Sequence, residues 1–196
     1  VVKQANDGGF IILSQTYVGS QAKQLLIKTD SAGNPAWSKL LDGIYGNGLI
    51  EANDGSWLIT GGVRLNTMNY IFLYKLTNNG SLQWAKTFDE YGGNTELQAT
   101  DDGYLILAEE AELIKTDSEG NVDWAKKYFN QVEQSLANNM CLTKDNGCII
   151  TGMKYLSGSE WDLFLFKTDS SGNSGCTDLT LNPYASDFLP QIIDHT

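Results

Sequence analysis

The chain has 196 residues, of which 41% are apolar and 19% are charged. Acidic residues outnumber basic ones 24 to 13, so the net charge is −11, and a phosphate backbone would be repelled. We find no apolar run of the roughly 18 residues that a membrane-spanning helix needs. The composition therefore favours a globular domain with a sizeable core and argues against nucleic acid and a membrane span.

One sequence pattern occurs four times along the chain. The aromatic residue that follows each turn of the Asn-Asp-Gly type is Phe10, Trp57 and then Tyr104, and Cys148 takes the fourth place. These positions are 47, 47 and 44 residues apart. A second marker has the same phase: a lysine stands five residues before a glycine, and four residues further on comes a tryptophan or, in the last copy, a cysteine (Lys28, Gly33, Trp37; Lys75, Gly80, Trp84; Lys115, Gly120, Trp124; Lys167, Gly172, Cys176).

Each copy contains about four short runs rich in β-branched and aromatic residues, separated by Gly, Asn and Asp. In the second copy we predict strands at 48–52, 57–63, 70–76 and 82–88. No helical periodicity is present. Four antiparallel strands per repeat predict an all-β protein, a β-propeller of four four-stranded blades, as a closed ring or an arc of a larger ring. The predicted blades are residues 1–47, 48–94, 95–137 and 138–181, and residues 182–196 form a closing strand or tail.

The repeat resembles known propeller families. The step Asp30, Gly33, Trp37, with its counterpart in the third copy, is similar to the tryptophan-docking motif of quinoprotein-type propellers. The run Asn-Asp-Gly-Gly-Phe-Ile-Ile followed by Lys-Thr-Asp-Ser-x-Gly-Asn-x-x-Trp resembles the propeller repeats of secreted and cell-surface proteins in bacteria and archaea. This resemblance implies a propeller fold and an extracellular or cell-surface location, and it implies no activity.

The recurring residues have structural roles on physical grounds. Asp30, Asp117 and Asp169 stand where a side-chain oxygen can cap a turn, and the following glycines supply positive φ. We expect Asn78 to take the place of the aspartate in the second copy. We expect Trp37, Trp84 and Trp124 to be mostly buried and to pack between adjacent sheets.

Loops of variable length are the expected place for a binding site. The spacing from the repeat aromatic to the repeat lysine is 18, 18, 11 and 19 residues, whereas the Asn-Asp-Gly and Asp-Ser-x-Gly-Asn turns hardly change. Variable loops on a rigid scaffold usually carry binding. The predicted ligand- or partner-binding residues are Tyr45, Arg64, Tyr91, Tyr155 and Trp161.

Catalytic and metal chemistry find little support in the sequence. His195, the only histidine, stands next to the last residue of the sequence, and the turn aspartates lack the spacing of an EF-hand. We therefore predict no catalytic residues, no metal and no cofactor. Cys141, Cys148 and Cys176 match no zinc pattern. For Cys148 and Cys176, which occupy aromatic positions of the repeat, small buried side chains are the first interpretation and an inter-strand disulfide the alternative.

The predicted function is a non-enzymatic extracellular propeller that acts as a protein-binding or structural module, with a protein partner or self-assembly. A carbohydrate-binding propeller is the alternative, and a hydrolase with paired carboxylates on the variable loops is the second alternative. We also predict that the fourth blade is the least regular. Asp187 to Ile193, or a strand from another chain, should cover an exposed sheet edge.

Overall fold

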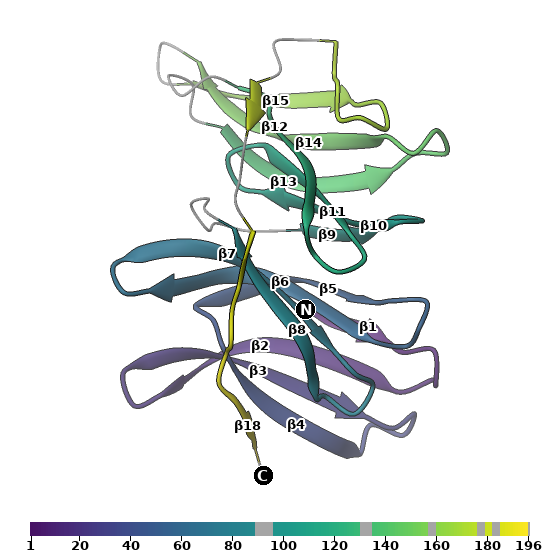
Figure 1. Ribbon diagram of the computed structural model, residues 1–196, viewed down its shortest axis with the longest axis vertical. Helices are drawn as coiled ribbons and strands as arrows, with labels where there is room; N and C mark the ends of the chain where they lie inside the picture. Colours follow the sequence, from purple (N-terminus) through teal and green to yellow (C-terminus); the bar gives the residue numbers. More distant parts are fainter. Residues whose placement is uncertain (89–95, 130–134, 157–159, 176–178, 182–184, 196) are drawn as a thin grey trace. The chain divides into compact units, whose positions relative to one another are not determined.

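The computed structural model describes residues 1–88, 96–129, 135–156, 160–175, 179–181 and 185–195. The described residues form an all-β fold of antiparallel sheets (Figure 1). The chain divides into two compact units: unit 1 contains residues 1–95 and 185–196, and unit 2 contains residues 96–184.

Unit 1 contains two five-stranded sheets. Sheet A has the order β1 (Val2–Gln4), β2 (Phe10–Val18), β3 (Gln21–Thr29), β4 (Pro35–Asp42) and β18 (Ile192–Asp194). Sheet B has the order β5 (Tyr45–Glu51), β6 (Trp57–Leu65), β7 (Met68–Leu76), β8 (Leu82–Phe88) and β17 (Ala185–Asp187). The four strands predicted in the second copy are thus confirmed, and β5 to β7 are somewhat longer than predicted.

Unit 2 contains the sheets of the third and fourth copies. Sheet C has the order β9 (Glu96–Ala99), β10 (Gly103–Ala108), β11 (Glu112–Asp117), β12 (Val122–Lys127) and β16 (Leu179–Leu181). Sheet D has three strands, β13 (Ser135–Leu142), β14 (Cys148–Leu156) and β15 (Glu160–Lys167). Among the described residues, sheet D therefore lacks the fourth strand that the repeat predicts.

The turn between the third and fourth strands of a repeat is closed by one aspartate. Oδ1 of Asp30 accepts the backbone N–H groups of Ala32 (2.9 Å) and Asn34 (2.8 Å), and Oδ2 accepts the side-chain amide of Asn34 (2.9 Å). Asp117 and Asp169 make the same three bonds. The turn glycines have positive φ, as predicted (Gly33 86°, Gly120 80°, Gly172 76°).

The second copy closes this turn differently from the prediction. Thr77, not Asn78, stands three residues before the turn glycine and so occupies the aspartate's position. Its Oγ1 accepts the N–H of Ser81 at 3.0 Å. A hydroxyl can cap this turn as a carboxylate does, so the fold tolerates the substitution.

The repeat lysine of each sheet pairs with an aspartate in the turn between the first two strands. The Nζ–Oδ distances are 2.8 Å for Lys28–Asp7, 3.0 Å for Lys75–Asp54, 2.7 Å for Lys115–Asp102 and 2.5 Å for Lys167–Asp145. In the sequence, these lysines stand out only by their regular spacing. In the first three copies the ammonium group is largely buried and needs a partner, which explains why lysine and aspartate recur together.

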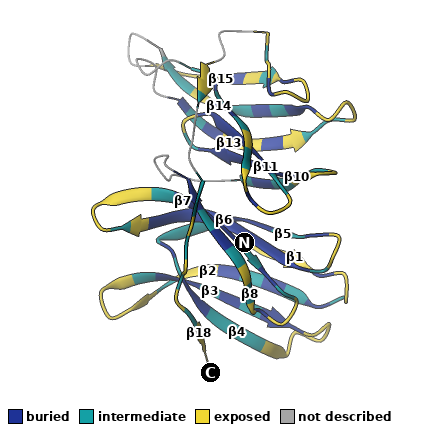
Figure 2. Cartoon of the chain, in the orientation of Figure 1, coloured by how far each residue is buried: buried dark blue, intermediate teal, exposed yellow. Residues whose placement is uncertain are grey.

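Successive sheets share a core within each unit. In unit 1, Ile11, Leu13 and Leu26 of sheet A pack with residues of sheet B such as Trp57 and Tyr74. In unit 2, a second cluster joins sheets C and D (Leu105, Leu107, Leu113, Met140, Cys148, Ile150, Phe164). Each unit is therefore stabilised by sheet-on-sheet packing (Figure 2).

The three repeat tryptophans lie at the same register on the fourth strands but are half-buried, not mostly buried as predicted. Each stands opposite the repeat lysine, beside a shift in pairing register. Trp37 reaches the turn of sheet B, where its Nε1 donates to the carbonyl of Asn78 at 3.2 Å. Trp124 covers Gly172, where an added Cβ would be 2.5 Å from the indole.

Gly172→Ala should destabilise the fold more than Gly33→Ala. Both glycines have left-handed φ, so both changes introduce similar strain, but no heavy atom lies within 4 Å of a Cβ at Gly33. We expect the change at Gly172 to cost about 1–3 kcal/mol more. Urea unfolding of the two variants measures this difference. Equal losses would show that the contact between Trp124 and Gly172 is unimportant.

The C-terminal tail supplies the fifth strand of three sheets. β16 pairs with β12, β17 with β8, and β18 with β4. The predicted fourth blade ended at residue 181, yet Leu179–Leu181 pairs with sheet C. As predicted, the tail covers exposed edges and the fourth copy is the least regular, but the covered edges belong to the first three copies.

The tail contacts an equivalent lysine on each of these sheets. Lys126 donates to Thr180 (3.3 Å), Lys86 pairs with Asp187 (2.6 Å), and Lys39 pairs with Asp194. The three tail residues are seven positions apart. A regular spacing in the tail thus matches the repeat of the sheets.

Candidate functional site

One face of sheet D carries apolar side chains that are exposed to solvent. Because directly opposed residues of paired strands share a face, the register of β13, β14 and β15 places them together. We call this surface the open face of sheet D; it contains Leu136, Cys141, Ile149, Thr151, Met153, Tyr155, Trp161, Leu163, Leu165 and Lys167. The exposed fractions reach 77% at Leu163 and 65% at Leu165, and Figure 2 shows exposed positions along β15.

The opposite face of sheet D is packed, which shows that the exposure is one-sided. Phe164 is 7% exposed and belongs to the core of unit 2, and Phe166 packs against the same core. β15 thus alternates between a buried aromatic face and an exposed aliphatic face. Exposed aliphatic side chains that lie together mark an interaction surface more than scattered ones do.

The open face adjoins a strand edge. In the order β13-β14-β15, no described strand pairs with the outer edge of β15. The outer strands of sheets A, B and C are covered by the tail. Unpaired N–H and C=O groups on such an edge can pair with a strand of another chain.

Two of the predicted binding residues lie on the open face. Tyr155 and Trp161 are directly opposite each other, and their rings meet edge to face with centroids 5.6 Å apart. Tyr45, on β5, is half-buried, and an added Cβ at Gly62 would be 2.4 Å from its ring. Arg64 is exposed on β6. Tyr91 lies outside the described residues, so its predicted role is not addressed.

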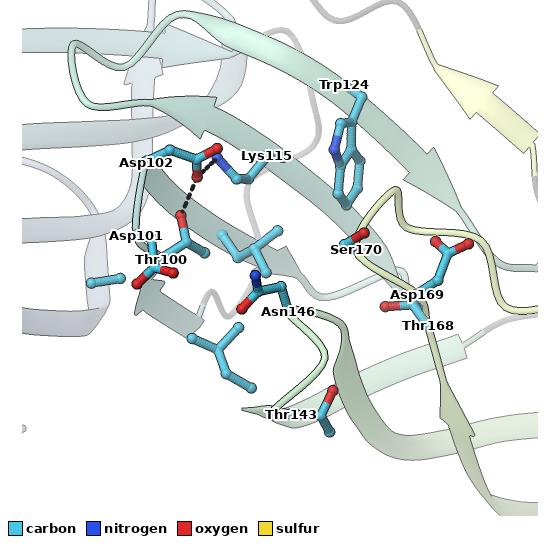
Figure 3. Close-up of a pocket in the computed structure, with 13 residues that line it drawn as sticks. Thr100, Asp101, Asp102, Lys115, Trp124, Thr143, Asn146, Thr168, Asp169 and Ser170 are labelled. Atoms are coloured by element: carbon cyan, nitrogen blue, oxygen red, sulfur yellow. Dashed lines mark hydrogen bonds and ion pairs between the residues drawn. The ribbon is translucent and has the colours of Figure 1, made fainter.

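A pocket of about 410 Å³ lies in unit 2 between the turns of the third and fourth copies (Figure 3). It is lined by the β9–β10 turn, Trp124, the β13–β14 turn and the segment that follows β15. These are the turns that hardly change between copies. Sequence reasoning placed the site on the variable loops, because loop length is visible in a sequence whereas the space between two turns is not.

The pocket contains polar groups that are paired with one another and polar groups that are not. Lys115 pairs with Asp102, and Thr100 donates to the same carboxylate at 2.9 Å. Within the described part of the chain, the side chains of Asp101, Asn146 and Ser170 make no hydrogen bond. A carboxylate, an amide and a hydroxyl therefore remain available beside the half-buried indole of Trp124.

Two carboxylates at the β10–β11 connection are held in ion pairs. Glu110 and Glu112 both contact Nζ of Lys127, at 2.7 and 2.5 Å. Burial by itself lowers the pKa of Lys127, but the two glutamates outweigh it and raise the pKa. This arrangement keeps the Lys127 ammonium group charged and holds both carboxylates against it.

The described cysteines are free thiols. Cys141 is exposed and Cys148 is buried, and burial raises the pKa of the Cys148 thiol. The small buried residue expected at 148 is thus confirmed. Cys176 lies outside the described residues. In the ranges that the structure describes, no group of three or more His, Cys, Asp or Glu side chains could hold a metal ion.

Acid should destabilise the protein between about pH 4 and pH 2. Hydrogen bonds from Ser56 lower the pKa of Asp54 to about 2, and the contact with Lys167 lowers that of Asp145 to about 2. An unfolded aspartate has a pKa of about 3.9. A carboxyl group whose pKa is lower in the folded state stabilises the fold at pH values above its unfolded pKa. This contribution is lost as the pH falls through the folded pKa. Urea midpoints at pH 2, 3, 4 and 7 measure it.

Asp145→Asn is the matched variant for this pH dependence. It removes one carboxyl group whose pKa is lowered. The loss of stability between pH 4 and pH 2 should therefore become smaller. Equal midpoints for the unmodified chain at pH 4 and pH 2 would contradict the prediction.

Comparisons with known proteins provide no family. No protein-family model matches the chain, and no curated protein is significantly similar to it. Over the described residues, the structure contains no helix long and apolar enough to cross a membrane.

Proposed function

We propose that the chain is a β-propeller module that binds protein, as a structural or recognition part of an extracellular or cell-surface assembly, and that it is not an enzyme. The propeller assignment is supported by three features. Each copy folds as its own antiparallel sheet, successive sheets pack face to face within each unit, and the half-buried tryptophans occupy one register. The extracellular location follows from the resemblance of the repeat to secreted propeller repeats.

The observation that carries protein binding is the open face of sheet D. Leu163 and Leu165 lie side by side on a strand whose outer edge has no described partner. Covering aliphatic side chains contributes about 25 cal/mol for each Å² removed from water. The neighbouring aromatic pair, Tyr155 and Trp161, has the composition of an interface anchor.

Capture of surface proteins from the source organism tests this function. The chain is immobilised, and bound proteins are identified by mass spectrometry. Leu163→Lys should abolish capture of an identified partner, whereas Leu189→Lys should retain it because Leu189 is 89% exposed and lies in the tail. Both variants should unfold at the urea midpoint of the unmodified chain. The same captured proteins with both variants would overturn the proposal.

The pocket supports carbohydrate binding as a second candidate. Aromatic side chains present a flat apolar surface on which a sugar ring can stack, and Trp124 lines the pocket. Asp101, Asn146 and Ser170 could hydrogen-bond to sugar hydroxyls. An array of glycans tests this: Trp124→Ala and Asn146→Ala should each lose a signal that Leu163→Lys retains. An array without signal would exclude this candidate.

The charges of the described carboxyl groups do not favour the hydrolase alternative. Six described carboxyl groups have a lowered pKa (Asp7, Asp30, Asp54, Asp102, Asp145, Asp169). A carboxyl group that donates a proton near neutral pH needs a raised pKa. The charge arrangement therefore favours a binding function.

A further inference from the structure

Equivalent positions of the repeat are buried in sheet A and exposed in sheet D. Leu26 of sheet A is 0% exposed, whereas its equivalent in sheet D, Leu165, is 65% exposed. The side chain of Lys28 is 5% exposed, whereas that of Lys167 is 45% exposed. The repeat lysines of sheets B and C, at 13% and 9%, resemble Lys28. Sheet D therefore presents a face that the repeat elsewhere buries.

Unit 1 shows what covers this face in the first copy. Sheet B places Trp57, Ile59 and Tyr74, each 0% exposed, in one core with the Leu26 face of sheet A. By analogy, the surface that would cover the open face of sheet D belongs to another sheet built from this repeat. That sheet should carry large apolar residues at the positions equivalent to Trp57, Ile59 and Tyr74.

Sheet A offers such a face. The residues at those three positions in the first copy are Phe10, Ile12 and Ile27, and all three are only half-buried. Ile12 stands opposite Ile27 on β3 and opposite Val2 on β1, and Val2 is 61% exposed. The chain thus carries an uncovered apolar face on its first copy and a complementary one on its fourth.

We propose that the open face of sheet D binds sheet A of a second copy of this chain, head to tail, in the geometry that sheets A and B adopt within unit 1. This inference rests on the proposed function and names its partner. A repeat face that no neighbouring repeat covers is usually polar, and neither of these two faces is. A head-to-tail contact uses two different surfaces, so it produces rings or filaments and not only dimers.

Charge sets the expected salt dependence. Each chain has a net charge of −11. Two chains therefore repel each other at low ionic strength, and they repel each other less when salt screens the charge. The contact itself is apolar. Association should therefore become stronger as NaCl increases, the opposite of an association held by ion pairs.

Sedimentation of the chain over a range of concentrations tests the proposal. We expect the mass to rise above the 21.5 kDa of one chain and Leu163→Lys to weaken association at least tenfold. Val2→Lys should weaken it similarly, with Ile12→Lys as a second variant of the same face. Leu189→Lys is the control that should associate normally. Circular dichroism confirms that each variant is folded.

Mixing the two face variants distinguishes head-to-tail binding from a symmetric contact. The Val2→Lys copy retains its sheet D face, and the Leu163→Lys copy retains its sheet A face. Their mixture should therefore form a 1:1 dimer that grows no further. Association of Val2→Lys alone, with no rescue on mixing, would indicate contact between two D sheets and overturn the proposal.

Cys141 reports the open face independently, because it is exposed and stands opposite Ile149. Its alkylation, followed by peptide mass spectrometry, should slow as protein concentration rises. Protection at every concentration with a mass of 21.5 kDa would mean that the chain covers its own face. That result would exclude binding of a second chain. A monomer whose Cys141 is alkylated equally fast at all concentrations would exclude it as well. Partner capture lost by Leu163→Lys would then still support protein binding.

Discussion

Deletion of residues 185–196 lowers the free energy of unfolding of unit 1 by about 4 kcal/mol, the sum of two strand additions and two apolar contacts. The deletion removes β17 and β18, and it uncovers the edges of β8 and β4. Phe188 and Ile192 also pack against the unit 1 core. The tail is therefore expected to be an integral part of the fold.

Hydrogen exchange and urea unfolding measure this effect. Amides at the uncovered edges of β4 and β8 should exchange faster in the truncated chain, and the urea midpoint should fall. Leu189→Ala is the control within the same segment, because Leu189 is 89% exposed and its truncation should change stability by less than about 0.5 kcal/mol. An unchanged midpoint after truncation would show that the tail contributes nothing to stability.

Trp57→Ala lowers the free energy of unfolding by about 3–5 kcal/mol, because removing a buried indole leaves a cavity. Trp57 is 0% exposed and lies in the core between sheets A and B. The loss should be larger than for Trp37→Ala, since Trp37 is half-buried. Urea unfolding of both variants gives the comparison.

Trp57→Phe is the informative control for this core position. Among the described residues, Nε1 of Trp57 has no hydrogen-bond partner, and a buried unpaired donor costs about 1–3 kcal/mol. Phenylalanine, the residue at this position in the first copy, removes that donor and retains most of the apolar contact. We expect it to cost less than half as much as alanine. Equal costs for alanine and phenylalanine would contradict this account of the site.

The half-burial of the repeat tryptophans could not be predicted from their spacing. Spacing shows that Trp37, Trp84 and Trp124 are equivalent, and the register confirms this. Whether a large ring is covered depends on how far the neighbouring turn extends over it. In unit 1 that turn supplies the carbonyl of Asn78, which leaves part of the Trp37 ring in solvent.

The lysine–aspartate pairs show a similar limit. The lysine and its partner aspartate are 21, 21, 13 and 22 residues apart in the four copies. This variation reflects the loop between the second and third strands, so no fixed interval signals the pair. The third copy also closes its first turn one residue earlier, with Thr100 N–H bonded to the carbonyl of Gly103. Asp102 then takes the role that Asp7 has in the first copy.

The candidate site was only partly predictable. Tyr155 and Trp161 were predicted and lie on the open face, but Leu163 and Leu165 were missed because alternating aliphatic residues are typical of any half-buried strand. Their exposure becomes visible only in the tertiary structure, because it depends on what covers this face of the sheet and not on the strand itself. The replacement of the repeat aromatic by Cys148 and of the repeat tryptophan by Cys176 were the signals in the sequence that this copy is different.

The sequence by itself determined what is local: the fourfold pattern, the strands and the Asp-Ser-x-Gly-Asn turns. Each of these depends on residues within about five positions, where side-chain caps and positive φ act directly. Tertiary structure alone decided the path of the tail. By position Leu179–Leu181 fits a fourth strand of sheet D, yet it pairs with β12. Strand edges offer nearly identical hydrogen-bonding groups, so the choice among them depends on packing and charge over the whole fold, such as the lysine contacts of Thr180 and Asp187.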